Sequence, residues 1–587
     1  MAGDRIKGLA PTPGTGLQRL RRLAGPDLLG AAAAPAAAAA LTLLFVIPTL
    51  APAISSWDTA EFQTVGPVLG TAHPTGYPAY VILGWLASIV LQPFGDPAFR
   101  MNLLQAVLAA LAVAGTVALV QILTGRRLVA LAVGLVLAGT QLFWRLSTHA
   151  DPHMLHVALV VTLFAVLVVW DQRRRSEDPE TVKRADRWLV AAAVIFGVAV
   201  ANHSLALLLP PAIGLYVLAC DPRIIFRWRT IVACLAALAF TITVLFLELP
   251  IRAAMHAPLV YGHPDTLSGF QYVVLAEQFR GSLSDPLGDL GTKMGHVMDL
   301  MTGWIGPLAV LAAVGLGTSL IRRPRYILLS GLSLAASCVF AASYANADIE
   351  RYYLVPLLVV LTWAALGAAD VITVAAWAMN EVRERFLGVS TAAGATADPT
   401  AEATADEPAT ASDAPSKVRP RGDGWTPWLL LAGEFVVAAA LVFPVVGIVP
   451  QRQGLESALN PGGVSEANKN GDSVWLRAVL APADQGGLPK NSVIVSWWST
   501  STTLWYGQRV LGMRPDIYIV DDRTRLDDNL GEVQDVFNKF LGNRPVFTIR
   551  LSGGVDGMDA LNTEFNIEPY SLGDGSTISH VVGRKGS

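Results

Sequence analysis

The sequence predicts a polytopic α-helical membrane protein with about eleven transmembrane helices and a small C-terminal α/β domain. The composition and the length of the apolar runs predict this fold class. Apolar residues make up 53% of the 587-residue chain and charged residues only 15%, whereas soluble globular proteins carry about 25% charged residues. The mean hydropathy of +0.47 agrees with this reading. Since a helix needs about 20 mostly apolar residues to cross a bilayer, runs of this length are the candidate spans.

Eleven runs reach this length or come close to it. The first is too long for a signal-peptide core, so it counts as a span. Residues 77–92 are also apolar, but Pro78 breaks this stretch and Pro93 closes it, so we expect an interfacial or re-entrant helix there. The expected spans are 28–50, 101–123, 128–146, 153–170, 187–202, 204–220, 230–250, 300–320, 326–344, 353–378 and 427–449.

The distribution of Lys and Arg predicts how the spans are oriented. The N-terminus and the loops that follow even-numbered spans are rich in these residues, as at Arg173-Arg174-Arg175, and the opposite loops are poor in them. Cytoplasmic loops carry such an excess. We therefore expect a multi-pass protein of the cell membrane with a cytoplasmic N-terminus and an extracytoplasmic C-terminal domain.

This orientation divides the chain into five segments. We expect a disordered cytoplasmic N-terminus over residues 1–27 and a membrane domain over 28–379. Residues 380–424 are rich in Ala, Thr, Asp and Pro, which predicts a disordered cytoplasmic linker. The last span falls within 425–449, and the extracytoplasmic α/β domain covers 450–587.

Alternating strand and helix patterns predict the α/β domain. Buried strands are expected at Val493–Trp497, Ile517–Val520 and Val546–Leu551. Helical patterns at Thr502–Leu511 and Leu526–Leu541 separate them. The domain contains no cysteine, so its stability must come from its own core and from docking onto the membrane part.

Composition excludes some classes of function. The net charge of −3 and the lack of a long basic tract argue against a nucleic-acid partner. The three cysteines form no spaced pair, which argues against a disulfide framework or a zinc site. His149 and His153 flank Asp151 without the spacing of a zinc motif. The sequence thus does not indicate a divalent metal, although it does not exclude one.

The loops expected outside the membrane collect most of the ionisable residues that could form a site. Burying such groups near lipid is costly, so clusters of them usually line a functional site. The candidate residues are Trp57, Asp58, Glu61, His73, Tyr77, Asp151, His153, His203, Arg252, Arg280, Asp348, Arg351 and Tyr352.

These residue types fit the transfer of a sugar from a lipid phosphate. A carboxylate must take the proton of the acceptor hydroxyl, and Asp58 and Glu61 lie at i and i+3 on one face of a helix. We expect Asp58 to be the base and Glu61 to tune or orient it. Cationic groups must stabilise the phosphate, and aromatic rings should stack on the sugar. The candidates for these two tasks are Arg252, Arg280 and Arg351, and Trp57, Tyr77 and Tyr352.

Several of these motifs also have a purely structural interpretation. Asp58-Thr59-Ala60-Glu61 matches a helix capping box. The segment His73–Pro78 could form a rigid turn. Asn202-His203 could satisfy backbone groups at a helix break, and Arg252 could reach to lipid headgroups.

The first outer loop contains the motif Trp57-Asp58-x-x-Glu61-Phe62 followed by His73–Pro78. This motif resembles the transmembrane O-mannosyltransferase-like family, long catalogued as a domain of unknown function. The resemblance covers most of 40–355 and part of 450–525. Supporting segments are Asn202-His203, Pro250-Ile251-Arg252, Tyr261–Pro264, Gly269-Phe270 through Gln278-Phe279-Arg280, Leu488-Pro489 through Trp505-Tyr506, and Arg514-Pro515-Asp516.

This resemblance implies a GT-C architecture and a glycosyltransferase activity. It implies a polyprenyl-phosphate-linked sugar, mannose or another hexose, as donor, and a protein or glycan hydroxyl as acceptor. It implies that Asp58 is the catalytic base. The sequence departs from the family at Ala150–His153, where family members commonly have an acidic residue followed by Val-Tyr.

Two other classes of function compete with this interpretation. A transporter or lipid flippase would place its ionisable residues near the bilayer midplane, often in repeated halves. The ionisable residues here lie at the outer ends of the spans, and no repeat is visible. A non-catalytic scaffold that presents the C-terminal domain would not need clustered acids in the first loop.

Overall fold

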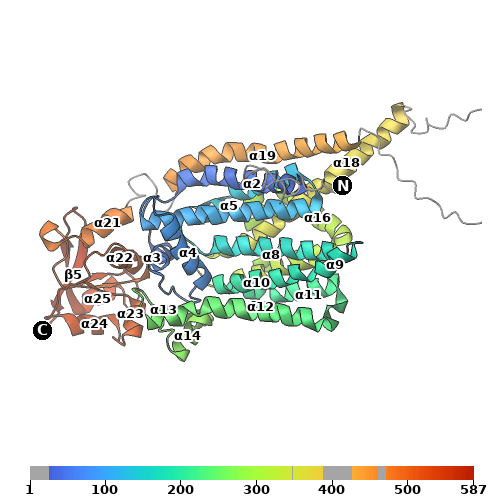
Figure 1. Cartoon of the computed structure of the whole chain (residues 1–587). Helices are drawn as coiled ribbons and strands as arrows, with labels where there is room; N and C mark the ends of the chain where they lie inside the picture. The colour runs from blue at the N-terminus through green and yellow to red at the C-terminus, as the bar shows by residue number, and fades with distance from the viewer. Residues whose placement is uncertain (1–25, 347, 388–425, 460–470, 555, 587) are drawn as a thin grey trace, which may run out of the picture.

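The computed structural model divides the chain into a bundle of long helices and a smaller α/β domain that lies against one end of the bundle (Figure 1). We call the end that meets this domain the domain end. Helix α9 (Pro179–Arg184) lies at the opposite end (Figure 1). The structure describes residues 26–346, 348–387, 426–459, 471–554 and 556–586.

The predicted cytoplasmic disorder falls largely outside these residues. Residues 1–25 of the expected N-terminal segment and 388–425 of the expected linker lie outside the described ranges. The start of that linker is helical, because α18 (Leu354–Leu387) continues beyond residue 380.

The chain is an integral, multi-pass membrane protein. Within the described residues, eight helical segments are long and apolar enough to cross a membrane, or ten if each of two bent helix pairs counts as one span. The eight are α2 (Pro26–Val46), α5 (Pro97–Thr124), α8 (His153–Arg174), α9 with α10 (Asp186–Asn202), α12 (Trp228–Phe246) with α13 (Glu248–Ala254), α17 (Pro324–Ala341), η5 (Ile349–Tyr353) with α18, and α19 (Thr426–Leu459).

Three of the eleven expected spans differ from the prediction. The run 204–220 forms a short 3-10 helix, η2 (Ser204–Leu208), and an 11-residue helix, α11 (Pro210–Cys220), because two prolines follow Leu209. The run 128–146 is bent by 70° between α6 (Arg127–Gly139) and α7 (Gln141–Ser147).

The third difference falls on the expected span 300–320. The chain turns by 115° between α15 (Leu290–Ile305) and α16 (Leu308–Arg322). Gly306 makes this turn with a φ of +52°, which glycine adopts without steric cost, and Pro307 follows it. An apolar pattern alone does not reveal such a corner.

The first loop folds into two helices at the domain end. Helix α3 covers Trp57–Val68, and α4 covers Pro78–Val90 in the stretch expected to be interfacial or re-entrant. Helix α4 is apolar but shorter than the candidate spans. Smaller elements complete the membrane part: η1 (Ile47–Thr49), η3 (Pro222–Phe226), α14 (Leu267–Val274) and η4 (Glu277–Ser282).

The C-terminal domain contains one five-stranded sheet with the order β2-β1-β3-β5-β4. The predicted strands are confirmed as β1 (Val493–Ser496), β2 (Tyr518–Val520) and β3 (Val546–Ile549), and β1 pairs in parallel with both neighbours. Two antiparallel strands, β4 (Phe565–Ser571) and β5 (Thr577–Arg584), extend the sheet beyond β3. Few of their residues are fully buried, so they carry a weak hydrophobic signal.

The helices of this domain refine the prediction. Helix α22 (Trp498–Arg509) follows β1 directly, somewhat earlier than expected. The helix expected at 526–541 is split into α23 (Asp522–Asp527) and α24 (Val533–Phe540), with Gly531 in the left-handed region between them. Further elements are α21 (Gly471–Val479), η6 (Ala483–Gln485) and α25 (Met558–Glu564). Because α19 continues to Leu459, the expected domain start at residue 450 is wrong.

Candidate active site

The carboxylate of Asp58 lies where the first loop, the start of the α18 span and the C-terminal domain meet. Its Oδ2 accepts a hydrogen bond from Arg351 Nη2 at 3.0 Å, and its Oδ1 accepts one from Trp498 Nε1 at 2.9 Å. The Asp58 side chain remains 26% exposed, whereas that of Arg351 is only 12% exposed. The acid is thus fixed in place but still accessible.

The geometry of α3 rules out the capping interpretation of Asp58. The N-cap of α3 is Ser56, which makes no side-chain capping bond, and Asp58 lies inside the first turn. The Asp58 carboxylate bonds groups from two distant segments instead.

Several neighbours determine the charge state of Asp58. Burial raises the pKa of this carboxyl, but the charges of His73 and Arg351 and the hydrogen bonds from Trp498 and Arg351 outweigh burial, so the pKa lies below its ordinary value. Asp58 is therefore ionised at neutral pH and can accept a proton.

Arg351 also pairs with a second buried acid. Its Nη1 lies 3.5 Å from Asp151 Oδ2, and Asp151 Oδ1 accepts hydrogen bonds from the backbone N–H and the ring Nδ1 of His153, both at 2.7 Å. Burial opposes ionisation of Asp151, but His153 and Arg351 outweigh it and hold its pKa far below the ordinary value. One guanidinium thus bridges two carboxylates from separate loops.

Glu61 pairs with His73 and not with Asp58, which corrects the expected link between the two acids. The fully buried Glu61 accepts hydrogen bonds from the His73 backbone N–H at 2.7 Å and from the His73 ring Nδ1. Burial lowers the pKa of His73, but Glu61 and Asp58 outweigh burial and the net pKa is raised. The other ring nitrogen of His73 lies 3.2 Å from the Tyr77 hydroxyl.

Four rings, those of Tyr77, His153, His203 and Tyr352, form a cluster close to His73 and Asp151. The ring centroids of His153 and His203 lie 4.6 Å apart. The Tyr77 centroid lies 5.4 Å from that of His203, and the Tyr352 centroid lies 5.2 Å from that of His153. Burial lowers the pKa of His203 well below its ordinary value, so this imidazole is neutral.

Four buried nitrogens in and around this cluster have no hydrogen-bond partner among the described residues. They are Nε2 of His153, Nε2 of His203, Nε of Arg351 and Nδ1 of His156, whose ring centroid lies 5.9 Å from that of His203. A buried polar group normally has a partner, because leaving it unpaired costs free energy. Such nitrogens mark a place that a polar ligand or water can fill.

Four predicted site residues lie outside this cluster or face away from it. Arg252 donates hydrogen bonds to the carbonyls of Leu69 at 2.7 Å and Val68 at 3.2 Å, so it supports the backbone of the first loop. Arg280 is exposed and pairs with Glu277 at 3.1 Å.

Asp348 and Trp57 lie at the rim of the site. Asp348 pairs with Arg145 at 3.0 Å, and more than a third of its side chain is exposed. Trp57 is half exposed, has a φ of 59°, and contacts Trp497 edge-on at 4.9 Å. A non-glycine residue with positive φ costs free energy and is common at functional sites.

Trp498 and Arg145 belong to the site but were not among the predicted residues. The Trp497-Trp498 pair directly after β1 was a usable signal, because ligand-binding residues gather at the carboxyl ends of parallel strands. Arg145 lies in a short apolar helix, and its partner Asp348 is 203 residues away in the chain, so no local pattern reveals it.

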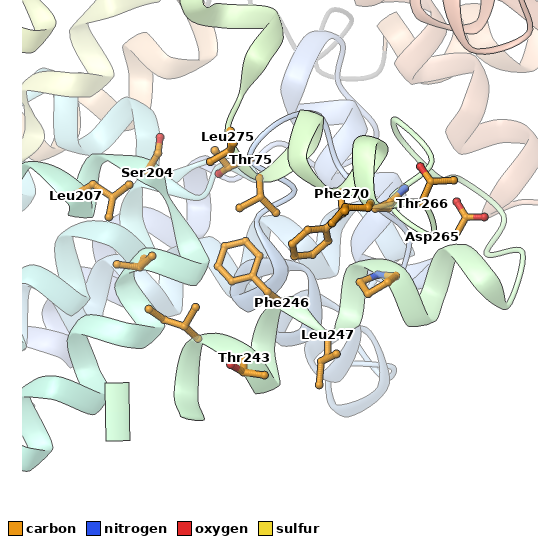
Figure 2. Close-up of a pocket in the computed structure, with 16 residues that line it drawn as sticks. Thr75, Ser204, Leu207, Thr243, Phe246, Leu247, Asp265, Thr266, Phe270 and Leu275 are labelled. Atoms are coloured by element: carbon orange, nitrogen blue, oxygen red, sulfur yellow. The ribbon is translucent and has the colours of Figure 1, made fainter. Parts of the chain in front are cut away.

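An apolar pocket of about 570 Å³ lies next to the site at the domain end (Figure 2). Phe246, Leu247 and Phe270 are among its apolar side chains (Figure 2). Thr75, two residues after His73, and Ser204, which follows His203, also line it. The pocket therefore adjoins the loops that carry two site histidines.

Within the described residues, no group of three or more His, Cys, Asp or Glu side chains is arranged to hold a metal ion. The histidines of the site instead bond to carboxylates or pack against tyrosines.

Comparison with known proteins confirms the family resemblance. Residues 58–225 match the family model described as the Protein O-mannosyl-transferase TMEM260 N-terminal domain. The Mus musculus protein named Protein O-mannosyl-transferase TMEM260 is 27% identical over 375 residues, which is 60% of this chain and 51% of that protein. The chain thus spans about half the length of this curated relative.

The fold of one solved structure, ArnT in the apo state, supports the GT-C-like architecture. ArnT from Cupriavidus metallidurans in the apo state has a TM-score of 0.50 and 14% identity, with 92% of this chain and 96% of that chain covered. ArnT bound to undecaprenyl phosphate has a TM-score of 0.49 and 13% identity, with 94% and 98% covered. At this identity the likeness concerns the fold, a helical membrane part with a small C-terminal domain.

Proposed function

We propose that the chain is a membrane glycosyltransferase that moves a mannose or another hexose from a polyprenyl-phosphate carrier to a hydroxyl of an extracytoplasmic protein or glycan. The arrangement of Asp58 carries this proposal. Its carboxylate is ionised, partly exposed and held by Arg351, directly beside buried nitrogens that have no partner. The resemblance to O-mannosyltransferases favours mannose and a protein acceptor.

Asp58 is the proposed general base. The acceptor oxygen attacks the anomeric carbon of the sugar, its proton passes to Asp58, and the bond from that carbon to the phosphate oxygen breaks. The polyprenyl phosphate leaves with the bonding electrons. A carboxylate that is ionised at neutral pH suits this task.

Arg351 and His203 are the proposed ligands of the donor phosphate. Nε of Arg351 and Nε2 of His203 are buried without a partner in the part of the chain that the structure describes, and the His203 nitrogen can donate because Nδ1 of the same ring accepts a hydrogen bond from the Leu205 N–H. Hydrogen-bond donors that are fixed in a buried site stabilise a developing negative charge without reorganisation. Of the three arginines first considered for the phosphate, Arg351 is the one that reaches this cluster.

The apolar pocket is the proposed seat of the polyprenyl chain. Its lining is mainly apolar, and Thr75 and Ser204 place its wall next to the loops of His73 and His203 (Figure 2). A lipid tail in this pocket would leave its phosphate near the buried nitrogens. Burial of each methylene contributes about 0.8 kcal/mol, so a long prenyl chain binds well there.

A transfer assay tests the proposal. Purified full-length chain is added to membranes from cells that lack it, together with polyprenyl-phosphate-linked mannose that carries a tritium label. We expect label to move from lipid to protein or glycan, and no transfer from a nucleotide-linked sugar. Movement of the labelled lipid between leaflets without a new glycosidic bond would instead identify a flippase.

A further inference from the structure

The C-terminal domain contacts the membrane part through the carboxyl edge of its parallel strands. Trp498 and Thr503 follow β1, and Arg523 follows β2. Thr503 donates a hydrogen bond to the carbonyl of Ser55 at 2.9 Å, and Arg523 stacks on the ring of Tyr261 at 3.5 Å. This edge is where α/β domains commonly bind ligands, and here it contacts the first loop at Ser55 and the loop between α13 and α14 at Tyr261.

Several aromatic contacts hold the Trp498 ring in one position. Its centroid lies 5.8 Å from that of His73, 6.2 Å from that of Tyr261 and 5.8 Å from that of Trp505. Edge-on aromatic pairs of this kind contribute free energy beyond the burial of area. These contacts fix the orientation of the Trp498 ring, and its indole N–H donates to Asp58.

The two oxygens of Asp58 are occupied by different parts of the protein. Arg351 from the membrane part bonds Oδ2, and Trp498 from the C-terminal domain bonds Oδ1. A carboxylate offers about four lone-pair positions, so each oxygen keeps capacity to accept the proton of a substrate. The indole N–H can only donate, and so it favours the charged form of Asp58.

We propose that Trp498 is a positioning residue for the reaction, through which the C-terminal domain orients Asp58 and keeps it ready to accept a proton. This inference rests on the proposed function. It gives the C-terminal domain a direct part in the active site, in addition to its contacts with the loops. Asp58 can then act as an efficient base only while the C-terminal domain is docked and Trp498 donates its hydrogen bond.

The test compares the pH dependence of transfer in full-length variants. Trp498→Phe keeps most of the ring packing and removes the N–H, and Trp475→Phe makes the same change in a partly buried ring of α21. The titratable groups that face Asp58 are Arg351 and Tyr352 from the start of the α18 span, and His73 and Tyr77 from the first loop. Asp151 acts on Asp58 through Arg351. All of them are unchanged in both variants.

We expect Trp498→Phe to lower kcat about tenfold near neutral pH, with little change in KM for the donor. The acidic limb of its pH–rate profile should move to higher pH, because the carboxylate loses a donor that stabilises its charge. Trp475→Phe should keep the wild-type limb. Partial loss of folded enzyme lowers the rate at every pH but does not move the acidic limb. The measurement therefore separates misfolding from a change in the pKa of Asp58.

The outcomes distinguish this inference from the proposed function. A Trp498→Phe enzyme with the wild-type limb and kcat overturns the positioning role. If Trp498→Phe yields too little folded enzyme, Trp498→Leu must show the same shift. An active Asp58→Asn enzyme would overturn the proposed base itself, whatever Trp498→Phe does.

Discussion

Arg351 Nη2 lies 3.0 Å from Asp58 Oδ2, although 293 residues separate the two in the chain. The same guanidinium reaches Asp151 at 3.5 Å. Three segments of the chain thereby meet at one charged group that is mostly buried. An isolated buried ion pair is costly to form, so this constellation is better explained by chemistry than by stability.

Replacement of Asp58 by Asn should abolish most of the transfer activity. Asn keeps the shape of the side chain, but it cannot take up a proton at neutral pH, and its single oxygen can accept only one of the two hydrogen bonds that Arg351 and Trp498 donate to Asp58. We expect the transfer rate to fall by about two orders of magnitude or more. The rate is measured with labelled donor, and Asp484→Asn, at an exposed position of the C-terminal domain, is the matched control. Near-native transfer by a folded Asp58→Asn protein would contradict the assignment.

Arg351 should not tolerate Lys. A lysine keeps the charge but cannot bond Asp58 and Asp151 together in the planar geometry of a guanidinium. We expect Arg351→Lys to slow transfer about tenfold or more, and Arg280→Lys to have a smaller effect because Arg280 is exposed and paired with Glu277.

The exposed Arg477 supplies the control for this comparison. Donor KM and kcat are measured for all three Lys variants. Equal losses in Arg280→Lys and Arg351→Lys would show that the buried position of Arg351 has no special importance for the donor phosphate.

The pair of His73 and Glu61 should make stability depend on pH. The pKa of His73 is raised above its ordinary value of 6.5 because, despite burial, Glu61 and Asp58 favour its charged form. The contribution of charged His73 to the stability of the fold is therefore fully present below pH 6.5. It is lost as the pH rises through the folded-state pKa of His73. We expect His73→Gln to lower the melting temperature most at acidic pH and less in alkaline buffer.

Thermal unfolding of the detergent-solubilised protein over a pH series checks this expectation. His263→Gln, at an exposed loop position outside the cluster, is the control. A loss of stability in His73→Gln that is constant over the whole pH range would mean that packing, and not the ion pair, stabilises this part of the first loop.

The predicted orientation can be tested by labelling. Single cysteines at Thr400 and Ala560, in a background without the three native cysteines, should react with a membrane-impermeant reagent from opposite sides. The excess of Lys and Arg in the loops after even-numbered spans places residue 400 inside and residue 560 outside. Labelling of both from the same side would exclude this topology.

Much of the fold could be read from local patterns. Long apolar runs located most of the helices, and short β-branched runs located β1, β2 and β3, because both signals depend only on neighbouring residues. The corner at Gly306 and the split between α23 and α24 were missed. Single glycines with positive φ produce these turns without changing the apolar pattern around them.

The sequence by itself determined the class of protein, the loops that carry the ionisable residues, and Asp58 as the acid of interest. Only the tertiary structure decided which partner each group has. Trp498 bonds Asp58 from 440 residues away, Glu61 turns to His73, and Arg252 supports the backbone of the first loop. The physical reason is that such contacts depend on how helices pack and how the C-terminal domain docks, and no local periodicity records either.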